Sequence, residues 1–285
     1  MSKGLAMPGV SLLDGAAQML QLLMQPDAIR ELRLQTGVRT FDVIVAPRRG
    51  QLVVVGAENG SGKSTYLLCL LLAAARRGVK CGLFSIEDTS LLLRARILGL
   101  LSGVNPVRIL DGKVSSDDMQ AIRDGVKRDA ETPLWFVEGE SNADTIAAQI
   151  QEMAQNGVQL VVVDYLQTLS GTQGQDRRNE MRVAVQRLAR IAREHRICLV
   201  LASQVVRPST REVGNEPNRH WLKEAGDIAD AADKIVMLWR EQANAHADTN
   251  LKLCKDKDGR HIGRTWQMYF DGNTGWLRDR VVTHG

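Results

Sequence analysis

Short apolar runs alternate with helix-like segments along most of the chain. The run QLVVVG at 51–56 leads through a glycine-rich stretch into an apolar segment at 66–75, which is the order strand, loop, helix. The same order recurs downstream, with predicted strands at 81–87, 134–139, 160–166 and 197–204 and predicted helices at 89–102, 142–155 and 176–195. Strands this apolar must be covered on both faces, so the pattern predicts an α/β fold in which helices sandwich a mostly parallel sheet.

A different spacing follows near the end of the chain. The runs at 234–240, 250–257 and 264–270 are separated by turns too short for crossover helices, which predicts an antiparallel extension of the same sheet. The sequence shows no internal repeat and no low-complexity linker. We therefore predict one α/β domain over residues 36–285, preceded by an amino-terminal tail at 1–35.

The tail contains a second kind of apolar pattern. Ser11 and Asp14 can cap a helix that Pro26 ends. Apolar residues cover almost the full circumference of this helix: Leu12, Leu13, Ala16, Ala17, Met19, Leu20, Leu22, Leu23 and Met24. Such a helix cannot face water on its own, so we expect it either to pack on its own domain or, as we favour, to dock on a neighbouring subunit.

Composition excludes several classes of protein. Of 285 residues, 44% are apolar and 25% charged, which is ordinary globular usage and excludes disordered, collagenous and coiled-coil chains. The net charge of +4 is compatible with a polyanionic partner but does not establish one. The four cysteines and five histidines show no zinc-ligand spacing. The longest uncharged apolar run, 66–75, is too short to cross a bilayer, and the amino terminus matches a secretory signal poorly, so we expect an intracellular protein without a membrane partner.

The strongest chemical signal is the run AENGSGKS at 57–64, which directly follows a predicted strand and opens a helix. This is the context of a P-loop. Gly60 and Gly62 let backbone N–H groups turn around a phosphate, Lys63 reaches the β/γ oxygens, and Ser64 ligates Mg²⁺. The predicted nucleotide-binding set is Glu58, Asn59, Gly60, Ser61, Gly62, Lys63, Ser64 and Thr65.

Three polar residues end other predicted strands. Asp164 ends LVVVD and supplies the carboxylate that a nucleotide-bound metal needs. Glu87 ends GLFSIE and could deprotonate an attacking water if its strand lies next to the P-loop strand; otherwise it is a solvated acid near a helix start. Gln204 ends ICLVLASQ, where its amide could sense the γ-phosphate and signal to the loop that follows, although geometry alone leaves this role open.

These segments together resemble the motor domain of the DnaB-like replicative helicases, within the RecA-like ATPases. The resemblance covers about residues 36–279 and rests on AENGSGKST, FSIED, VVVDYLQTLSG, LVLASQV, LKEAGDIADAADKIVMLWRE and LCKDKDG in that order. It implies ATP hydrolysis with ATP and Mg²⁺ as cofactors, Glu87 as catalytic base, Asp164 as metal ligand and Gln204 as coupling sensor.

The resemblance also implies basic residues that act on a neighbouring subunit's nucleotide, from a K-x-R-x-G run. Lys255 matches the lysine, and Lys257 stands where the family has an arginine finger. Because a lysine lacks the planar fork of arginine, it stabilises a transition state less well. Arg260 is the alternative candidate for the role of the arginine finger.

Two surfaces compete for nucleic acid. The helix at 176–195 with the residue after it carries seven arginines: Arg177, Arg178, Arg182, Arg187, Arg190, Arg193 and Arg196. They spread over about half of the helix, opposite an apolar stripe, which favours a solvated or intersubunit face. The loop 205–224 is nearly balanced in charge despite Arg207 and Arg211. The resemblance points to this loop, because the family's DNA-binding R-E-x-G run matches Lys223, Glu224 and Gly226.

The resemblance thus implies a homo-oligomeric, hexameric ring that moves on single-stranded DNA and unwinds duplex DNA during replication. A primase or a loader protein is a candidate partner, and the cytoplasm of a bacterial or phage-infected cell is the expected location. Two alternatives are a RecA-like recombination or DNA-loading ATPase that does not unwind, and an accessory ring that uses ATP only as an assembly ligand.

Overall fold

The computed structural model describes residues 10–164, 177–205, 217–222, 225–240, 248–259 and 262–279. The chain forms two compact units, Met1–Arg33 and Leu34–Gly285. The first unit contains α1 (Leu12–Leu23) and α2 (Pro26–Glu31). The Ser11 side chain caps α1 by accepting the backbone N–H of Asp14, as the sequence predicts, and α1 buries none of its residues. Pro26 does not end α1 but begins α2, where proline at the first helical position is favoured.

The second unit is built on one nine-stranded sheet of described residues, in the order β3-β2-β4-β5-β1-β6-β7-β8-β9. Strands β1 to β6 run parallel, and β7, β8 and β9 are added antiparallel. The predicted fold is therefore confirmed, and β9 is an additional strand. The strands are β1 (Leu52–Ala57), β2 (Cys81–Ser85), β3 (Leu134–Glu138), β4 (Leu160–Asp164), β5 (Cys198–Gln204), β6 (Lys234–Trp239), β7 (Thr249–Asp256), β8 (Thr265–Phe270) and β9 (Leu277–Asp279).

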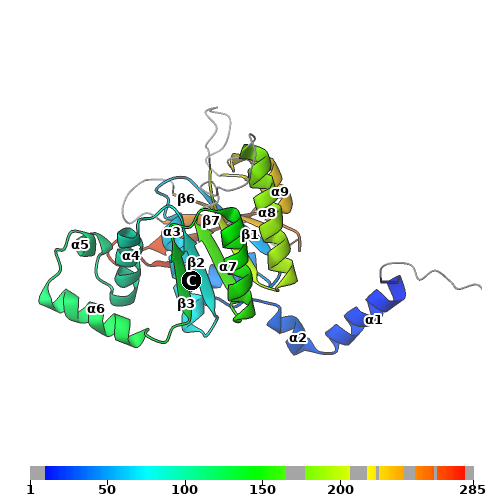
Figure 1. The fold of residues 1–285 in the computed structure, drawn as a ribbon, viewed down its shortest axis with the longest axis horizontal. Coiled ribbons are helices and arrows are strands. Elements are labelled where there is room, and N and C mark those ends of the chain that lie inside the picture. The colour runs from blue at the N-terminus through cyan, green and yellow to red at the C-terminus, as the bar shows by residue number, and fades with distance from the viewer. Residues whose placement is uncertain are drawn as a thin grey trace, which may run out of the picture. The chain divides into compact units, whose positions relative to one another are not determined.

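Helices cover both faces of this sheet (Figure 1). The helices in the described part of this unit are η1 (Phe41–Val45), α3 (Lys63–Arg76), α4 (Ser90–Ser102), α5 (Pro106–Leu110), α6 (Ser116–Arg128), α7 (Ala143–Gln155), α8 (Arg177–Glu194), η3 (Arg219–Trp221) and α9 (Ala225–Ala231). None of the helices in the described ranges is long and apolar enough to cross a membrane.

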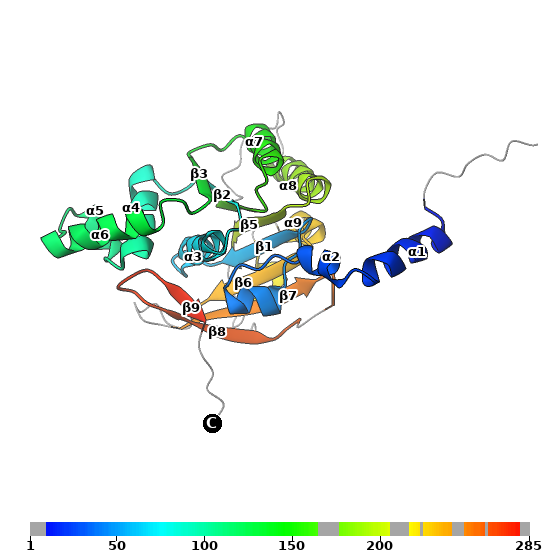
Figure 2. The same cartoon turned by 90° about the horizontal axis from the view of Figure 1, so that it is seen from below.

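The alternation of side chains along β1 divides the core into two layers. Val53 and Val55 pack with Phe41 and the apolar face of α3. Leu52 and Val54 face the other way and pack with α7, α8 and α9, which cover the second face (Figure 2). Burial on both faces explains why the parallel strands read as continuous apolar runs.

A group of three helices, α4, α5 and α6, lies to one side of the sheet in both views (Figures 1 and 2). The sequence predicted α4, but α5 and α6 were not expected. The signal for α6 was present, because Ser115 and Asp118 form a reciprocal capping box at its start. Helix α6 packs closely on α4 at Gly125, where an added Cβ would lie 2.6 Å from the carbonyl oxygen of Leu101.

Strand order answers the question that the sequence left open about the Glu87 strand. Strand β2, which precedes Glu87, does not lie next to the P-loop strand β1, because β4 and β5 lie between them. Strand β4, which ends in Asp164, is likewise separated from β1 by β5. Crossover helices alone do not fix strand order, so alternation in the sequence could not decide this point.

The close packing at Gly125 predicts that a methyl group is not tolerated there. Gly125→Ala raises helix propensity by about 1 kcal/mol, but it must push the backbones of α4 and α6 apart. We expect the free energy of unfolding, measured by urea denaturation, to fall by about 1–3 kcal/mol. Gly15→Ala in α1 is the control, since its added Cβ meets nothing closer than 3.9 Å. Unchanged or increased stability of Gly125→Ala would contradict the described packing.

Candidate nucleotide site

The loop between β1 and α3 has the backbone of a phosphate cradle. Gly60 and Gly62 have φ angles of 76° and 90°, in the left-handed region that favours glycine. The Ser61 hydroxyl donates to the carbonyl oxygen of Glu58, which tightens the loop. Helix α3 begins at Lys63, so its unpaired amino-terminal N–H groups and its dipole lie at the loop, where an anion is stabilised.

The structure brings the predicted nucleotide lysine and metal carboxylate together. Lys63 Nζ lies 2.8 Å from Asp164 Oδ1, and both side chains are only 10% exposed. Strand β5 lies between β1 and β4 in the sheet, so this contact joins residues that follow or end two non-adjacent strands. Ser85 of β2 is in register with Asp164, so the turn that follows β2 begins at the same point on the carboxyl edge of the sheet.

That turn contains Glu87 and Asp88. Glu87 is exposed to solvent. Asp88 is partly buried and forms an ion pair with Arg96 of α4. Burial raises the pKa of Asp88, the nearby charge of Asp164 adds to this effect, and Arg96 opposes it. Sequence reasoning missed Asp88 and Arg96, although Asp88 directly follows Glu87 in the chain.

Gln204 lies on the strand between the two halves of the site. It ends β5 in register with Ala57, the last residue of β1, and the N–H of Val205 donates to the carbonyl oxygen of Ala57 at 3.0 Å. The end of β5 is therefore hydrogen-bonded to the start of the P-loop. This placement gives Gln204 the neighbourhood that its predicted sensor role requires.

A second arginine that the sequence did not single out lies on the other side of the loop. Arg240 follows β6, which pairs with β1. A Cβ added at Gly62 would lie 2.7 Å from Arg240 Nη2, so the guanidinium packs directly on the P-loop. The guanidinium also lies 4.2 Å from the centre of the Phe270 ring. Its buried Nη2 has no hydrogen-bond partner among the described residues, and burial lowers its pKa.

Lys255 and Lys257 lie at the opposite edge of the sheet. Strand β7 is antiparallel to β6, so Asp256 pairs with Lys234 at the amino edge, whereas the P-loop follows the carboxyl end of β1. Six residues of extended strand separate these edges by roughly 20 Å. Lys257 Nζ lies 2.7 Å from Asp233 Oδ1, and Lys255 Nζ donates to the carbonyl oxygen of Ala229. Neither lysine reaches the nucleotide site of its own chain.

The predicted nucleic-acid residues fall mostly outside the described part of the chain. This holds for Arg207, Arg211, Lys223 and Glu224, and also for the alternative finger Arg260; the backbone of Gly226 lies in α9. On α8 the apolar stripe is buried. Arg187 pairs with Asp144, and Arg190 pairs with Glu194. These pairs agree with a solvated helix face.

The donor set fits a nucleotide-bound Mg²⁺. A hydroxyl from Ser64 and a carboxylate from Asp164 are hard oxygen ligands, and Mg²⁺ commonly takes one or two protein oxygens together with phosphates and waters. No group of three or more histidine, cysteine or acidic side chains that could hold a metal by itself occurs among the described residues. The site therefore suits an ion that arrives with a phosphate ligand.

The strand order, the P-loop and the acids at the strand ends give the chain a RecA-like fold with a candidate nucleotide site. Residues 33–276 match the family described as the DnaB-like helicase C terminal domain, and the chain belongs to this family. The resemblance predicted from the sequence is thereby confirmed.

Relatives of known sequence agree with this assignment. The chain is 28% identical over 231 residues to the replicative DNA helicase DnaB of Treponema pallidum, covering 79% of this chain and 52% of that protein. It is 27% identical over 241 residues to a probable replicative DNA helicase of Trieres chinensis, with the same coverages. The chain spans about half the length of these curated relatives.

Solved structures share its fold. A DnaB-like replicative helicase, solved in a study of its interactions with primase, superposes with a TM-score of 0.82 at 18% identity and covers 97% of this chain and 68% of that one. A solved ATPase domain gives a TM-score of 0.81 at 18% identity, over 93% and 98% of the two chains. A KaiC-like protein of Pyrococcus horikoshii gives 0.61 at 15% identity, over 87% and 98%.

Proposed function

We propose that this protein is an ATP-driven DNA helicase that works as a ring of identical subunits and unwinds duplex DNA during replication in the cytoplasm of a bacterial or phage-infected cell. The observation that carries the proposal is the contact between Lys63 and Asp164 at the edge of a sheet of the DnaB-like family. A phosphate-binding lysine beside a buried strand-end carboxylate is the arrangement that a nucleoside triphosphate with Mg²⁺ requires.

The P-loop N–H groups, Lys63 and the start of α3 hold the phosphates of ATP in this scheme, and Ser64 and Asp164 hold Mg²⁺. When bound, Mg²⁺ neutralises the charge that develops on the phosphate oxygens. Arg240 adds a fixed positive charge beside Gly62. Lys63 then exchanges its contact with Asp164 for the phosphates, which frees that carboxylate for the metal.

Glu87 is the proposed general base although β2 is not adjacent to β1, because Ser85, two residues before it, is in register with Asp164, which contacts Lys63 of the P-loop. Its exposure gives water access to the carboxylate, and the turn after β2 begins beside Asp164. Glu87 would take a proton from the attacking water as the water oxygen bonds to the γ-phosphorus and the bond to the β–γ bridging oxygen breaks, which releases phosphate and ADP. Gln204, whose strand is hydrogen-bonded to Ala57, registers the loss of the γ-phosphate and passes the change to the segment after β5.

A second copy completes the site. Lys255 and Lys257 lie at the edge of the sheet opposite the P-loop, so they serve catalysis only by reaching the nucleotide of an adjoining subunit. A head-to-tail contact of this kind generates a closed ring when the rotation closes, and we propose a hexamer. Single-stranded DNA is the proposed track, held by Arg207, Arg211 and the run from Lys223 to Gly226. A loader protein and a primase are the proposed partners. The structurally similar DnaB-like replicative helicase was solved in a study of its interactions with primase.

Glu87→Gln separates binding from chemistry. The amide cannot accept the proton of water, so we expect hydrolysis in the presence of single-stranded DNA to fall at least about a hundredfold. The affinity for a fluorescent ATP analogue should stay within about twofold, because Glu87 does not hold the phosphates in this scheme. Glu131→Gln, an exposed acid outside the site, is the matched control. Near-normal hydrolysis by Glu87→Gln would assign the base to another residue.

Strand displacement tests the function as a whole. We expect ATP- and Mg²⁺-dependent separation of a forked duplex with a free 5′ arm, and none of the same duplex with only a 3′ arm, since the resemblance implies 5′ to 3′ movement. Hydrolysis without displacement on either substrate would favour a recombination or loading ATPase. Negligible turnover with single-stranded DNA present would favour an accessory ring.

A further inference from the structure

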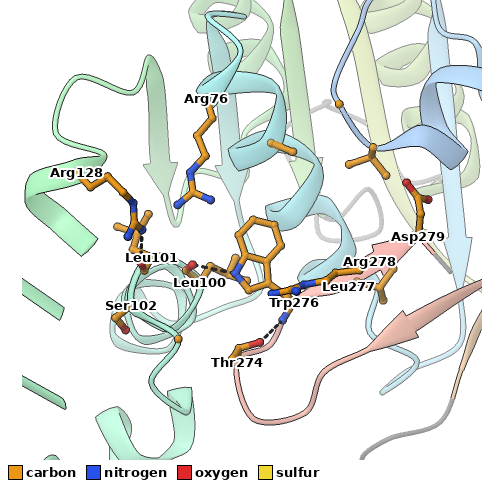
Figure 3. A pocket seen from close by; sticks show the side chains of 14 residues that line it. Arg76, Leu100, Leu101, Ser102, Arg128, Thr274, Trp276, Leu277, Arg278 and Asp279 are labelled. Carbon is orange, nitrogen blue, oxygen red and sulfur yellow. Dashed lines mark hydrogen bonds between the residues drawn. The ribbon is translucent and has the colours of Figure 1, made fainter. Parts of the chain in front are cut away.

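A pocket of about 520 Å³ opens far from the nucleotide site, where α3, α4 and α6 end and β9 begins (Figure 3). Helix α3 begins at Lys63 and ends at Arg76, so its 14 residues separate the two sites by about 20 Å. The volume is in the range of ordinary ligand sites, which is about 300–1,000 Å³. The predicted ATPase mechanism leaves this pocket unused.

The pocket combines an apolar floor with three arginines. Leu100, Leu101 and Trp276 supply apolar surface, and Arg76, Arg128 and Arg278 supply positive charge. Trp276 is fixed on one side, because its Nε1 donates to the carbonyl oxygen of Leu100 at 2.9 Å. The Arg76 guanidinium lies 5.5 Å from the centre of the Trp276 ring. These side chains are therefore held in place before any ligand arrives.

One carboxylate serves two of the arginines. Arg76 binds both oxygens of Asp129 at 2.6 and 2.7 Å through Nε and Nη2. Arg128 shares one of these oxygens. The Asp129 side chain is only 6% exposed, and the Arg76 guanidinium holds the pKa of that carboxyl below its usual range. Within the described part of the chain, the Nη1 groups of both arginines have no hydrogen-bond partner.

The other acid of the pocket is also occupied. The Asp279 carboxylate accepts from the backbone N–H groups of Arg39 and Thr40 and from the Thr40 hydroxyl. The Arg278 side chain is exposed and makes no hydrogen bond or ion pair within the described residues, and its charge also acts on the nearby Asp271 carboxylate. Asp129 pairs with Arg76 and Arg128, and Asp279 is bonded to the 39–40 segment, so the charge around the pocket is nearly balanced, and Arg278 is the lining arginine without a carboxylate partner at hydrogen-bond distance among the described residues.

Arginines at helix ends have a structural explanation that must be weighed first. Arg76 and Arg128 lie in the last turns of α3 and α6, where a positive charge stabilises the helix carboxyl end. Arg128 also donates to the Leu101 carbonyl. This explanation does not extend to Arg278, which lies on a strand. Arg278 is therefore the residue that distinguishes a binding site from a stabilising cluster.

The chemistry favours a protein ligand over nucleic acid. A nucleic-acid surface needs several uncompensated cations along a phosphate path, whereas this pocket carries little net charge and much apolar surface. Tryptophan and arginine beside aliphatic side chains are typical of the centres of protein interfaces. We propose that this pocket binds a partner protein through an aspartate or glutamate that lies next to a bulky apolar residue. The carboxylate meets Arg278, and the apolar side chain meets Leu101 and Trp276.

Fluorescence anisotropy with the full chain tests the proposal. The probe is a fluorescein-labelled peptide of repeated Glu-Leu-Asp-Leu units, and the comparison peptide carries lysine in place of each acid. We expect saturable binding of the acidic peptide only, and Arg278→Ala should weaken it about fivefold or more. The control is Arg123→Ala, which removes the same charge from an exposed position of α6 outside the pocket and should change nothing. ATP hydrolysis by both variants should remain normal, which shows that they fold.

Three results would overturn the proposal. They are equal binding of the acidic and lysine peptides, equal behaviour of Arg278→Ala and Arg123→Ala, and an Arg278→Ala defect confined to a fluorescein-labelled oligothymidylate. The last would make the pocket part of a nucleic-acid path. None of these results depends on strand displacement, so failure here is distinguishable from failure of the proposed helicase activity.

Discussion

The ion pair between Lys63 and Asp164 is the contact around which the candidate site is arranged. It joins the first residue of α3 to the last residue of β4 across an intervening strand, with both side chains nearly buried. A buried charge without a partner destabilises the folded protein, so each member of this pair requires either the other side chain or a ligand of opposite charge. In the proposed mechanism a triphosphate with Mg²⁺ would replace both partners at once, because the phosphates would bind Lys63 and the metal would bind Asp164.

The same sheet places the candidate catalytic residues at two opposite edges. The P-loop, Glu87, Gln204 and Arg240 lie at the carboxyl ends of the parallel strands, and Lys255 and Lys257 lie at the amino ends because β7 runs antiparallel. Apolar strands packed on both faces make this separation rigid. If the two lysines act on a nucleotide, as proposed, that nucleotide belongs to an adjoining copy, which is the basis of the proposed ring.

Much of this arrangement could be predicted from local sequence. The apolar runs that became β1 to β8 and the glycines of the P-loop carry their own signals, and the antiparallel extension followed from short turns. Contacts between residues that are distant in the sequence were harder to predict. Arg96 and Arg240 adjoin the site only through the tertiary arrangement, which local patterns do not encode, and for the same reason the sequence could not decide whether the Glu87 strand lies next to the P-loop strand. Helix α6 is mostly polar and β9 has three residues, so neither has a strong apolar pattern.

Mixing two inactive variants tests the central claim, that one nucleotide site is built from two copies. One variant carries Lys63→Ala and the other carries both Lys255→Ala and Lys257→Ala. Each alone should show negligible hydrolysis with single-stranded DNA. Random assembly of equal amounts pairs an intact P-loop with intact lysines at about a quarter of the interfaces, so the mixture should regain activity that neither variant has. Full activity of the double lysine variant alone, or a mixture no more active than its parts, would contradict the account.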